Sequence, residues 1–248
     1  MLSLDGEPGF ILHTRPYKEH SLLVELFTLN YGRLSAVARL SNKVASRSAG
    51  IYQPLIPLKM TLKQSRGSLW TLSDAFMQRG AYKIDVPTLF CAIYVNELIY
   101  NLVKTHESMP KLFAQYLRTL EDLEAGEDSS LTLRAFETAL IENLGYGIDY
   151  SSSDQGDIQD DLCYHFDLNS GFLLSSAVEE YSYSGHDLIN IRHNDMSSKR
   201  TRDVLKKINK CVIDSLLEGR KLKSRELYAQ FLIFTNLRKK KLKRKLSK

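Results

Sequence analysis

The stretch from Leu26 to Ser73 reads LFTLNYGRLSAVARLSNKVASRSAGIYQPLIPLKMTLKQSRGSLWTLS. It has no Asp or Glu, although the whole chain of 248 residues carries a net charge of only +5. Its basic residues are Arg33, Arg39, Lys43, Arg47, Lys59, Lys63 and Arg66. A surface with uncompensated cations attracts polyanions and speeds encounter with them. We therefore expect this stretch to bind nucleic acid.

The same stretch has the pattern of short β-strands. Five strand-like runs lie within residues 9–75, and turn residues separate them near positions 15–16, 30–32 and 65–67. In the run LKMTLK, alternation predicts that Lys59, Thr61 and Lys63 share one face. Five antiparallel strands in so few residues fit a small closed barrel, with Trp70 in its core. The OB-fold is the commonest such barrel that binds nucleic acid.

Beyond residue 80 the apolar period becomes helical. Helices are predicted at about 86–105, 110–125, 130–144, 199–218 and 224–237. Residues 149–180 lose the period, and LCYHFDLNSGFLLSS is typical of a short hairpin that turns at 169–171. Residues 238–248 contain eight cations and almost no apolar surface, which predicts a disordered tail.

The predicted fold class is α+β with several domains. An OB-fold barrel occupies residues 1–80, and a helical bundle is formed by residues 81–148 and 199–237. An acidic insert lies at 149–198, and a basic tail lies at 238–248. The net charges are +5 for residues 1–80, −6 for 81–150, −8 for 151–198 and +14 for 199–248. Two basic ends around an acidic middle favour nucleic-acid binding at the basic surfaces.

Several classes of function are disfavoured by what the sequence lacks. Its three cysteines stand far apart without a CxxC pair, which excludes a self-contained disulfide framework and a zinc site built on cysteine pairs. Walker A and GxGxxG patterns are missing, and its His-x-Asp pairs have no nucleophile nearby. No apolar run reaches the ~20 residues that span a bilayer, and the N-terminus lacks signal-peptide features. We expect a cytoplasmic protein with no cofactor and no catalytic residue.

Longer segments resemble a known family in the family's own order. They are GFILHTRPYKEHSLLVELFTLNYGRLSAVAR, IYQPLIPLKMTL with GSLWTLSDA, YVNELIYNLV, LFAQYLRTLEDL, LRAFETALIENLGYGIDY and LKSREL. Each segment alone is weak evidence for the family, but together the segments cover nearly the whole chain. The chain thus resembles the RecO family of bacterial recombination mediators.

The resemblance implies an N-terminal OB-fold, a central helical bundle and an inserted element like a zinc finger. It implies binding to single- and double-stranded DNA, annealing of complementary strands, and no bond-breaking activity. It also implies cooperation with RecR and with the acidic tail of single-stranded DNA-binding protein, so that RecA can load at gaps and breaks. A location at the nucleoid follows from these partners.

The insert departs from the family pattern. Many family members place four cysteines there, whereas this chain has Cys163 alone, with Ser175 and Ser176 where a pair is expected. His165 cannot replace three missing thiolates. We therefore predict an insert without a metal, held by packing.

Two sets of residues are candidates for binding. The seven basic residues of the opening stretch are expected to contact phosphates along the barrel and its loop, although a solvated surface that only aids solubility is the alternative. The second set combines cations with apolar side chains, as an acidic, aromatic peptide requires, and an ordinary exposed helix face is the alternative there. This predicted site for the tail of single-stranded DNA-binding protein consists of Lys111, Leu112, Phe113, Leu117, Arg118 and Arg134.

Two other functions stay open at this point. The barrel could belong to an RNA-binding OB-fold protein of RNA metabolism. The acidic segment 149–161 could instead serve a metal-dependent nuclease. Competition between RNA and DNA, and incubation of DNA with Mg²⁺ or Mn²⁺, distinguish these from a recombination mediator.

Overall fold

The computed structural model describes residues 2–40, 50–64, 67, 69–175 and 182–246, with the backbone alone for 236–246. They form two compact units, one from residues up to 127 and from 220 onward, the other from residues 128–219. The predicted helical bundle is therefore divided between two units. The reason is packing: α2 (Val86–Leu102) contacts α3 (Pro110–Ala125) and α7 (Lys223–Leu246), whereas α4 (Ser129–Asn143) contacts α6 (Lys199–Leu216).

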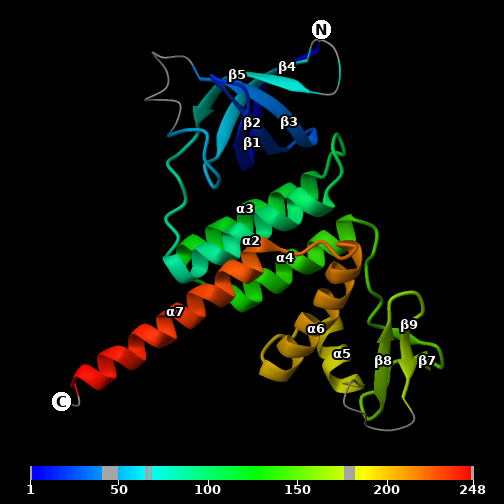
Figure 1. Ribbon diagram of the computed structural model, residues 1–248. Coiled ribbons are helices and arrows are strands. Elements are labelled where there is room, and N and C mark those ends of the chain that lie inside the picture. The colour runs from blue at the N-terminus through cyan, green and yellow to red at the C-terminus, as the bar shows by residue number, and fades with distance from the viewer. Residues whose placement is uncertain (1, 41–49, 65–66, 68, 176–181, 247–248) are drawn as a thin grey trace. The chain divides into compact units, whose positions relative to one another are not determined.

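The first unit contains a closed barrel, coloured blue to cyan in Figure 1. Its strands are β1 (Leu2–Pro16), β2 (Ser21–Thr28), β3 (Gly32–Arg39), β4 (Leu58–Gln64) and β5 (Trp70–Met77). They are hydrogen-bonded in the order β1-β2-β3-β5-β4, and β4 pairs with β1 to close the barrel. All five strands were expected to be antiparallel, but the β3–β5 pair is parallel and only the others are antiparallel. The predicted OB-fold is confirmed.

Strand β1 begins earlier than the sequence pattern predicts. It starts at Leu2, and its first residues pair with β4, where Leu4 lies opposite Leu62. The polar residues at 5–8 resemble a loop, but Glu7 is buried, and its carboxylate is satisfied by hydrogen bonds from Asn30 N (2.7 Å) and Nδ2 (2.9 Å). The extra strand length closes the barrel.

Alternation along the strands fills the barrel interior. Leu58, Met60 and Leu62 of β4 are fully buried, and the predicted core position of Trp70 is confirmed. Strand β2 is different, because every residue from Leu23 to Thr28 is buried. A strand buried on both faces needs a second layer outside the barrel, and the helices supply it.

Proline and glycine set the ends of the first unit's helices. Pro87 lies in the first turn of α2, and Pro110 begins α3, where a missing N–H costs nothing. Helix α3 ends at Gly126, whose φ of 78° lies in the left-handed region. No helix within the described ranges is both long and apolar enough to cross a membrane.

Helix α7 docks on α2 through its first turns. The Glu97 carboxylate accepts hydrogen bonds from Lys223 N (2.8 Å), Ser224 N (2.9 Å) and Ser224 Oγ (2.6 Å). The Phe90 ring packs against Tyr228 and Phe231. The helical backbone of α7 continues to Leu246, whereas the sequence predicted a disordered tail from residue 238. Lys, Arg and Leu all have high helix propensity, and no Gly or Pro interrupts them.

The second unit combines α4, α6 and the short α5 (Gly185–Arg192) with a small sheet of order β10-β8-β9-β6-β7. The strands are β6 (Ser152–Ser153), β7 (Gly156–Asp157), β8 (Cys163–Asp167), β9 (Gly171–Leu174) and β10 (Tyr183–Ser184). Strands β8 and β9 form the predicted hairpin, whereas α5 was not predicted. Tyr164 and Phe172 share a core with Leu188 and Ile208, so packing against helices holds the insert.

Candidate nucleic-acid interface

One side of the barrel, which we call the covered side, packs against α3. Phe10 of β1 and Phe27 of β2 point away from the barrel interior, and both are buried. The Phe10 ring meets Tyr116 edge-on at 5.0 Å, and Phe27 lies 5.4 Å from Phe113. Burial raises the pKa of Tyr116, whose hydroxyl donates to Asn96 Oδ1 (2.7 Å). This aromatic cluster excludes water and ligands from the β1–β2 side.

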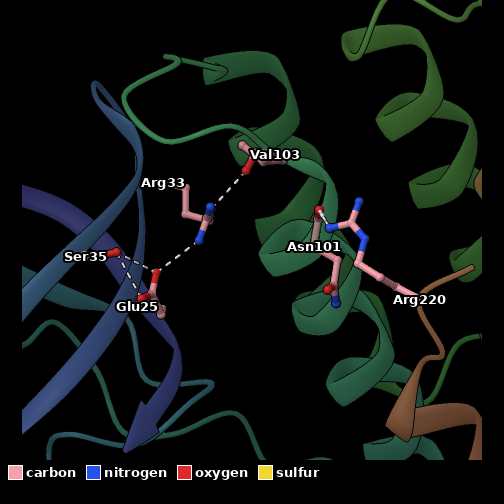
Figure 2. Close-up of polar contacts among 6 residues, drawn as sticks. All are labelled: Glu25, Arg33, Ser35, Asn101, Val103 and Arg220. Atoms are coloured by element: carbon pink, nitrogen blue, oxygen red, sulfur yellow. Dashed lines mark hydrogen bonds and ion pairs between the residues drawn. The ribbon is translucent and has the colours of Figure 1, made fainter. Parts of the chain in front are cut away.

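A polar contact closes one edge of the covered side (Figure 2). Arg33 donates from Nη1 to Glu25 Oε2 (3.1 Å) and from Nε to the Val103 carbonyl after α2 (2.9 Å). Its neighbour Gly32 has a φ of 63°, and a Cβ there would lie 1.8 Å from the Glu107 carbonyl oxygen. The start of β3 therefore lies so close to the chain after α2 that a side chain at position 32 does not fit.

Among the described residues, no helix covers the opposite side of the barrel, and we call it the open side. It comprises the outward residues of β4 and β5 and the end of β3: Arg39, Lys59, Lys63, Thr71, Ser73, Asp74 and Phe76. All of these are exposed. Cross-strand pairing joins Thr71 to Lys63 and Phe76 to Lys59. Of the described residues in this set, three are cations and one is a carboxylate, Asp74, whose Oδ1 accepts from Ala75 N (2.9 Å).

The predicted DNA-binding residues fall into three groups. Arg39, Lys59 and Lys63 lie on the open side, and the predicted outward face of β4 is confirmed. Arg33 belongs to the covered side, so the expectation that it has no carboxylate nearby is wrong. Glu25 lies just before the acid-free stretch in sequence, but antiparallel pairing brings it opposite Ser35. Lys43, Arg47 and Arg66 lie outside the described residues.

Sequence reasoning missed Phe76. The pattern predicted that the fifth strand ends at Ala75, whereas β5 continues to Met77. Phe76 is 64% exposed, more than any other large hydrophobic side chain in the described part of the chain. A prediction that extended this strand by two residues would have paired Phe76 with Lys59.

The predicted peptide site on α3 is not formed as one surface. Leu112 and Phe113 are buried, because the apolar stripe of α3 is the face that packs within its own unit. Lys111 and Arg118 are exposed and Leu117 is half-buried. Arg134 belongs to α4 in the other unit. Two apolar members of the predicted site are thus unavailable to a peptide.

Arg134 instead lines a cavity of about 830 Å³ within the second unit. Arg134 is 6% exposed and forms an ion pair with Glu137 (2.7 Å). Its Nε–H and the Asn209 Oδ1 have no hydrogen-bond partner among the residues that the structure describes. Arg192 is exposed beside the same cavity. Apolar walls come from α4, α5, α6 and the preceding loops through Leu131, Ile148, Ile191, Met196 and Leu205.

Comparison with protein families matches residues 5–79 to Recombination protein O N terminal and residues 85–226 to Recombination protein O C terminal. The chain belongs to the recombination protein O family. The N-terminal match covers nearly the whole barrel with its open side. The C-terminal match begins just before α2 and ends in the first turn of α7, so the cationic part of α7 lies beyond it.

Curated relatives of this chain include proteins with the name DNA repair protein RecO. The DNA repair protein RecO of Methylococcus capsulatus is 34% identical over 222 residues, which are 89% of this chain and 91% of the relative. The proteins of that name from Yersinia pestis and Yersinia pseudotuberculosis are 35% identical over 236 residues, covering 93% of this chain and 97% of theirs.

The insert at residues 149–198 contains the small sheet formed by β6 to β10. Cys163 begins β8 and is a free, half-buried thiol. His165 on the same strand forms a contact of 3.1 Å between its Nε2 and Ser175 Oγ. Asp154 accepts hydrogen bonds from Gln155 Nε2 (3.0 Å) and from Leu174 N of β9 (2.8 Å), and both lower its pKa. Ser176 lies outside the described residues.

Proposed function

We propose that this protein is a DNA-repair recombination mediator that binds single- and double-stranded DNA and anneals complementary strands without breaking bonds. The observation that carries the proposal is the open side of the barrel, where Arg39, Lys59 and Lys63 are exposed and Asp74 is the one carboxylate that β4 and β5 contribute. Phosphates are the partners that such a surface selects. Membership of the family and the name of the curated relatives support DNA as the polyanion.

A salt titration tests the open side. The triple variant Arg39→Gln, Lys59→Gln, Lys63→Gln should bind single-stranded DNA more weakly and lower the slope of log K against log salt by about 2, because each single-strand phosphate contact adds about 0.7. The matched control is Lys104→Gln, Lys111→Gln, Arg118→Gln, which removes the same charge from exposed positions outside the barrel. Equal losses in both triples would mean that net charge alone drives binding.

The mediator role has its own assay. Complementary oligonucleotides coated with single-stranded DNA-binding protein should anneal faster when this protein is added, and RecR with this protein should speed loading of RecA on gapped DNA. No acceleration of annealing would reject the proposal. We place the protein in the cytoplasm at the nucleoid, where these partners and their DNA meet.

For the tail of single-stranded DNA-binding protein we propose the cavity around Arg134 rather than the α3 face. A buried Arg with an unpaired Nε–H suits a carboxylate, and the apolar walls suit an aromatic side chain. Binding of a fluorescent acidic peptide that ends in an aromatic residue should fall with Arg192→Glu and persist with Arg118→Glu. The reverse result would restore the α3 face.

The cationic end of α7 is proposed to add phosphate contacts without sequence preference. Truncation after Leu237 removes eight basic residues, Arg238 to Lys248. DNA affinity should fall several-fold with a smaller salt slope. The thermal unfolding temperature should stay the same, because the docking contacts of α7 lie in its first turns.

The RNA-binding and nuclease alternatives have direct tests. A large preference for RNA over DNA of the same sequence in a competition experiment would favour the first. Cleavage of labelled DNA with Mg²⁺ or Mn²⁺ would favour the second. We expect neither result.

A further inference from the structure

The open side carries one aromatic residue, Phe76, among the residues that define it. Phe76 is directly opposite Lys59 in the antiparallel β4–β5 pair, and both side chains are exposed. Opposite residues on one face of such a pair have Cβ atoms about 4.5–5.5 Å apart. An aromatic ring and an ammonium group are therefore neighbours on the same surface.

The second cation of β4 extends this surface along the strand. Lys63 follows Lys59 by four residues, which is about 13 Å in a strand. Between them, Thr61 lies on the same face, and the Ser73 hydroxyl on β5 donates to the Thr61 carbonyl (3.1 Å). Side chains smaller than lysine or phenylalanine thus separate two cations, and one of those cations has an aromatic ring beside it.

We propose that Phe76 and Lys59 form a nucleotide subsite for single-stranded DNA, in which the Phe76 ring stacks on a base and Lys59 contacts the adjacent phosphate. This subsite rests on the proposed function and specifies its substrate. Every base has a π-face, so stacking on an aromatic side chain is strong and tolerant of sequence. In a duplex both faces of each base are already stacked, so the Phe76 ring has access only to single strands.

The geometry also connects the subsite to annealing. A base held by Phe76 keeps its pairing edge free, because stacking uses only the faces of the ring. When that base pairs and enters a duplex, its faces stack on neighbouring bases and it leaves Phe76. The subsite therefore binds a single strand with its pairing edges free and does not bind the annealed duplex through Phe76.

The experiment compares two oligonucleotides of equal length, oligo-dT and an abasic strand with the same phosphates, by fluorescence anisotropy. Phe76→Ala should weaken oligo-dT binding about tenfold and leave binding of the abasic strand unchanged. Lys59→Gln should weaken both and reduce the salt slope, whereas Phe76→Ala should not change that slope. Met77→Ala is the matched control, because Met77 is an exposed apolar neighbour on the same strand.

A gain-of-signal variant keeps the test independent of any loss of folding. The natural Trp70 is 2% exposed, so in Phe76→Trp the introduced indole is the exposed fluorophore. Oligo-dT should quench its emission and the abasic strand should not. Equal loss of both ligands in Phe76→Ala, no loss at all, or no quenching in Phe76→Trp would overturn the subsite. If the wild-type protein bound neither strand, the proposed function itself would fail.

Discussion

On the covered side of the barrel, Phe27 is fully buried against α3, whereas on the open side Phe76 is exposed beside Lys59. Arg33 and Arg39 differ in the same way, although both lie on the outward face of β3. Arg33 pairs with Glu25 and a carbonyl after α2, and Arg39 is free to meet solvent. One strand thus has a structural cation at its start and a candidate ligand-binding cation at its end. The layer outside the barrel, and not the residue type, decides between the two roles.

The largest expected difference lies between the two phenylalanines. Phe27→Ala should lower the free energy of unfolding by about 3–5 kcal/mol, because it leaves a cavity in the aromatic cluster. Phe76→Ala should change it by no more than about 0.5 kcal/mol. Urea unfolding of both variants measures this. A comparable loss in Phe76→Ala would show that the open side is covered in solution.

The two arginines should differ by a smaller amount. Arg33→Met leaves the Glu25 carboxylate, whose side chain is only 11% exposed, without its cation, which should cost about 2 kcal/mol. Arg39→Met should be nearly neutral for stability and should weaken DNA binding. Adding Glu25→Gln to Arg33→Met should recover part of the lost stability, and no recovery would contradict the role of this ion pair.

A pH-dependent contact ties the connection between β5 and α2 to α3. Glu124 accepts from Lys83 N (2.7 Å) and Arg79 Nη2 (2.6 Å), and these hydrogen bonds lower its pKa below the ordinary 4.5. A lowered carboxylate pKa adds stability above that value, which is lost as pH falls through the lowered pKa. Glu124→Gln should therefore reduce the unfolding temperature at pH 7. Thermal melts should converge with the wild type in acid, and a constant difference at all pH values would contradict this.

The smallest effect concerns the one carboxylate of the open side. Asp74→Asn should raise affinity for single-stranded DNA about twofold at low salt, because a repelling charge near Lys59 and Lys63 is removed. The gain should vanish at high salt. Glu121→Gln, an exposed carboxylate on α3, is the control and should have no effect. Equal gains in both variants would mean that the affinity for single-stranded DNA depends only on the net charge of the protein.

The barrel was predictable because its signals are local. Alternation in β4 correctly predicted which side chains point outward, and turn residues separated the strands. The first residues of β1 were not predicted as a strand because they are polar. The residue that donates hydrogen bonds to the buried Glu7 is Asn30, 23 residues away. The end of β5 was misjudged because Ala75, Phe76 and Met77 are consecutive apolar residues, which breaks the alternating pattern in the sequence.

The candidate sites were less predictable, because they depend on which helix packs against which surface. The helix at 110–125 was correctly predicted, but sequence could not show that Phe113 faces the barrel. Nor could it show that α4 pairs with α6, which puts Arg134 in another unit. Arg33 looked free because its partner Glu25 stands one residue outside the acid-free stretch.

The Glu97 carboxylate that receives the start of α7 has a consequence for biosynthesis. The first unit is built from both ends of the chain, whereas the second is one continuous segment, residues 128–219. Domains fold as units while the chain leaves the ribosome, N-terminal parts first. The barrel and the second unit can therefore form before Lys223 and Ser224 are available to donate hydrogen bonds to Glu97. Until those residues emerge, Phe90 on the nascent protein lacks the aromatic rings of α7 that later pack against it.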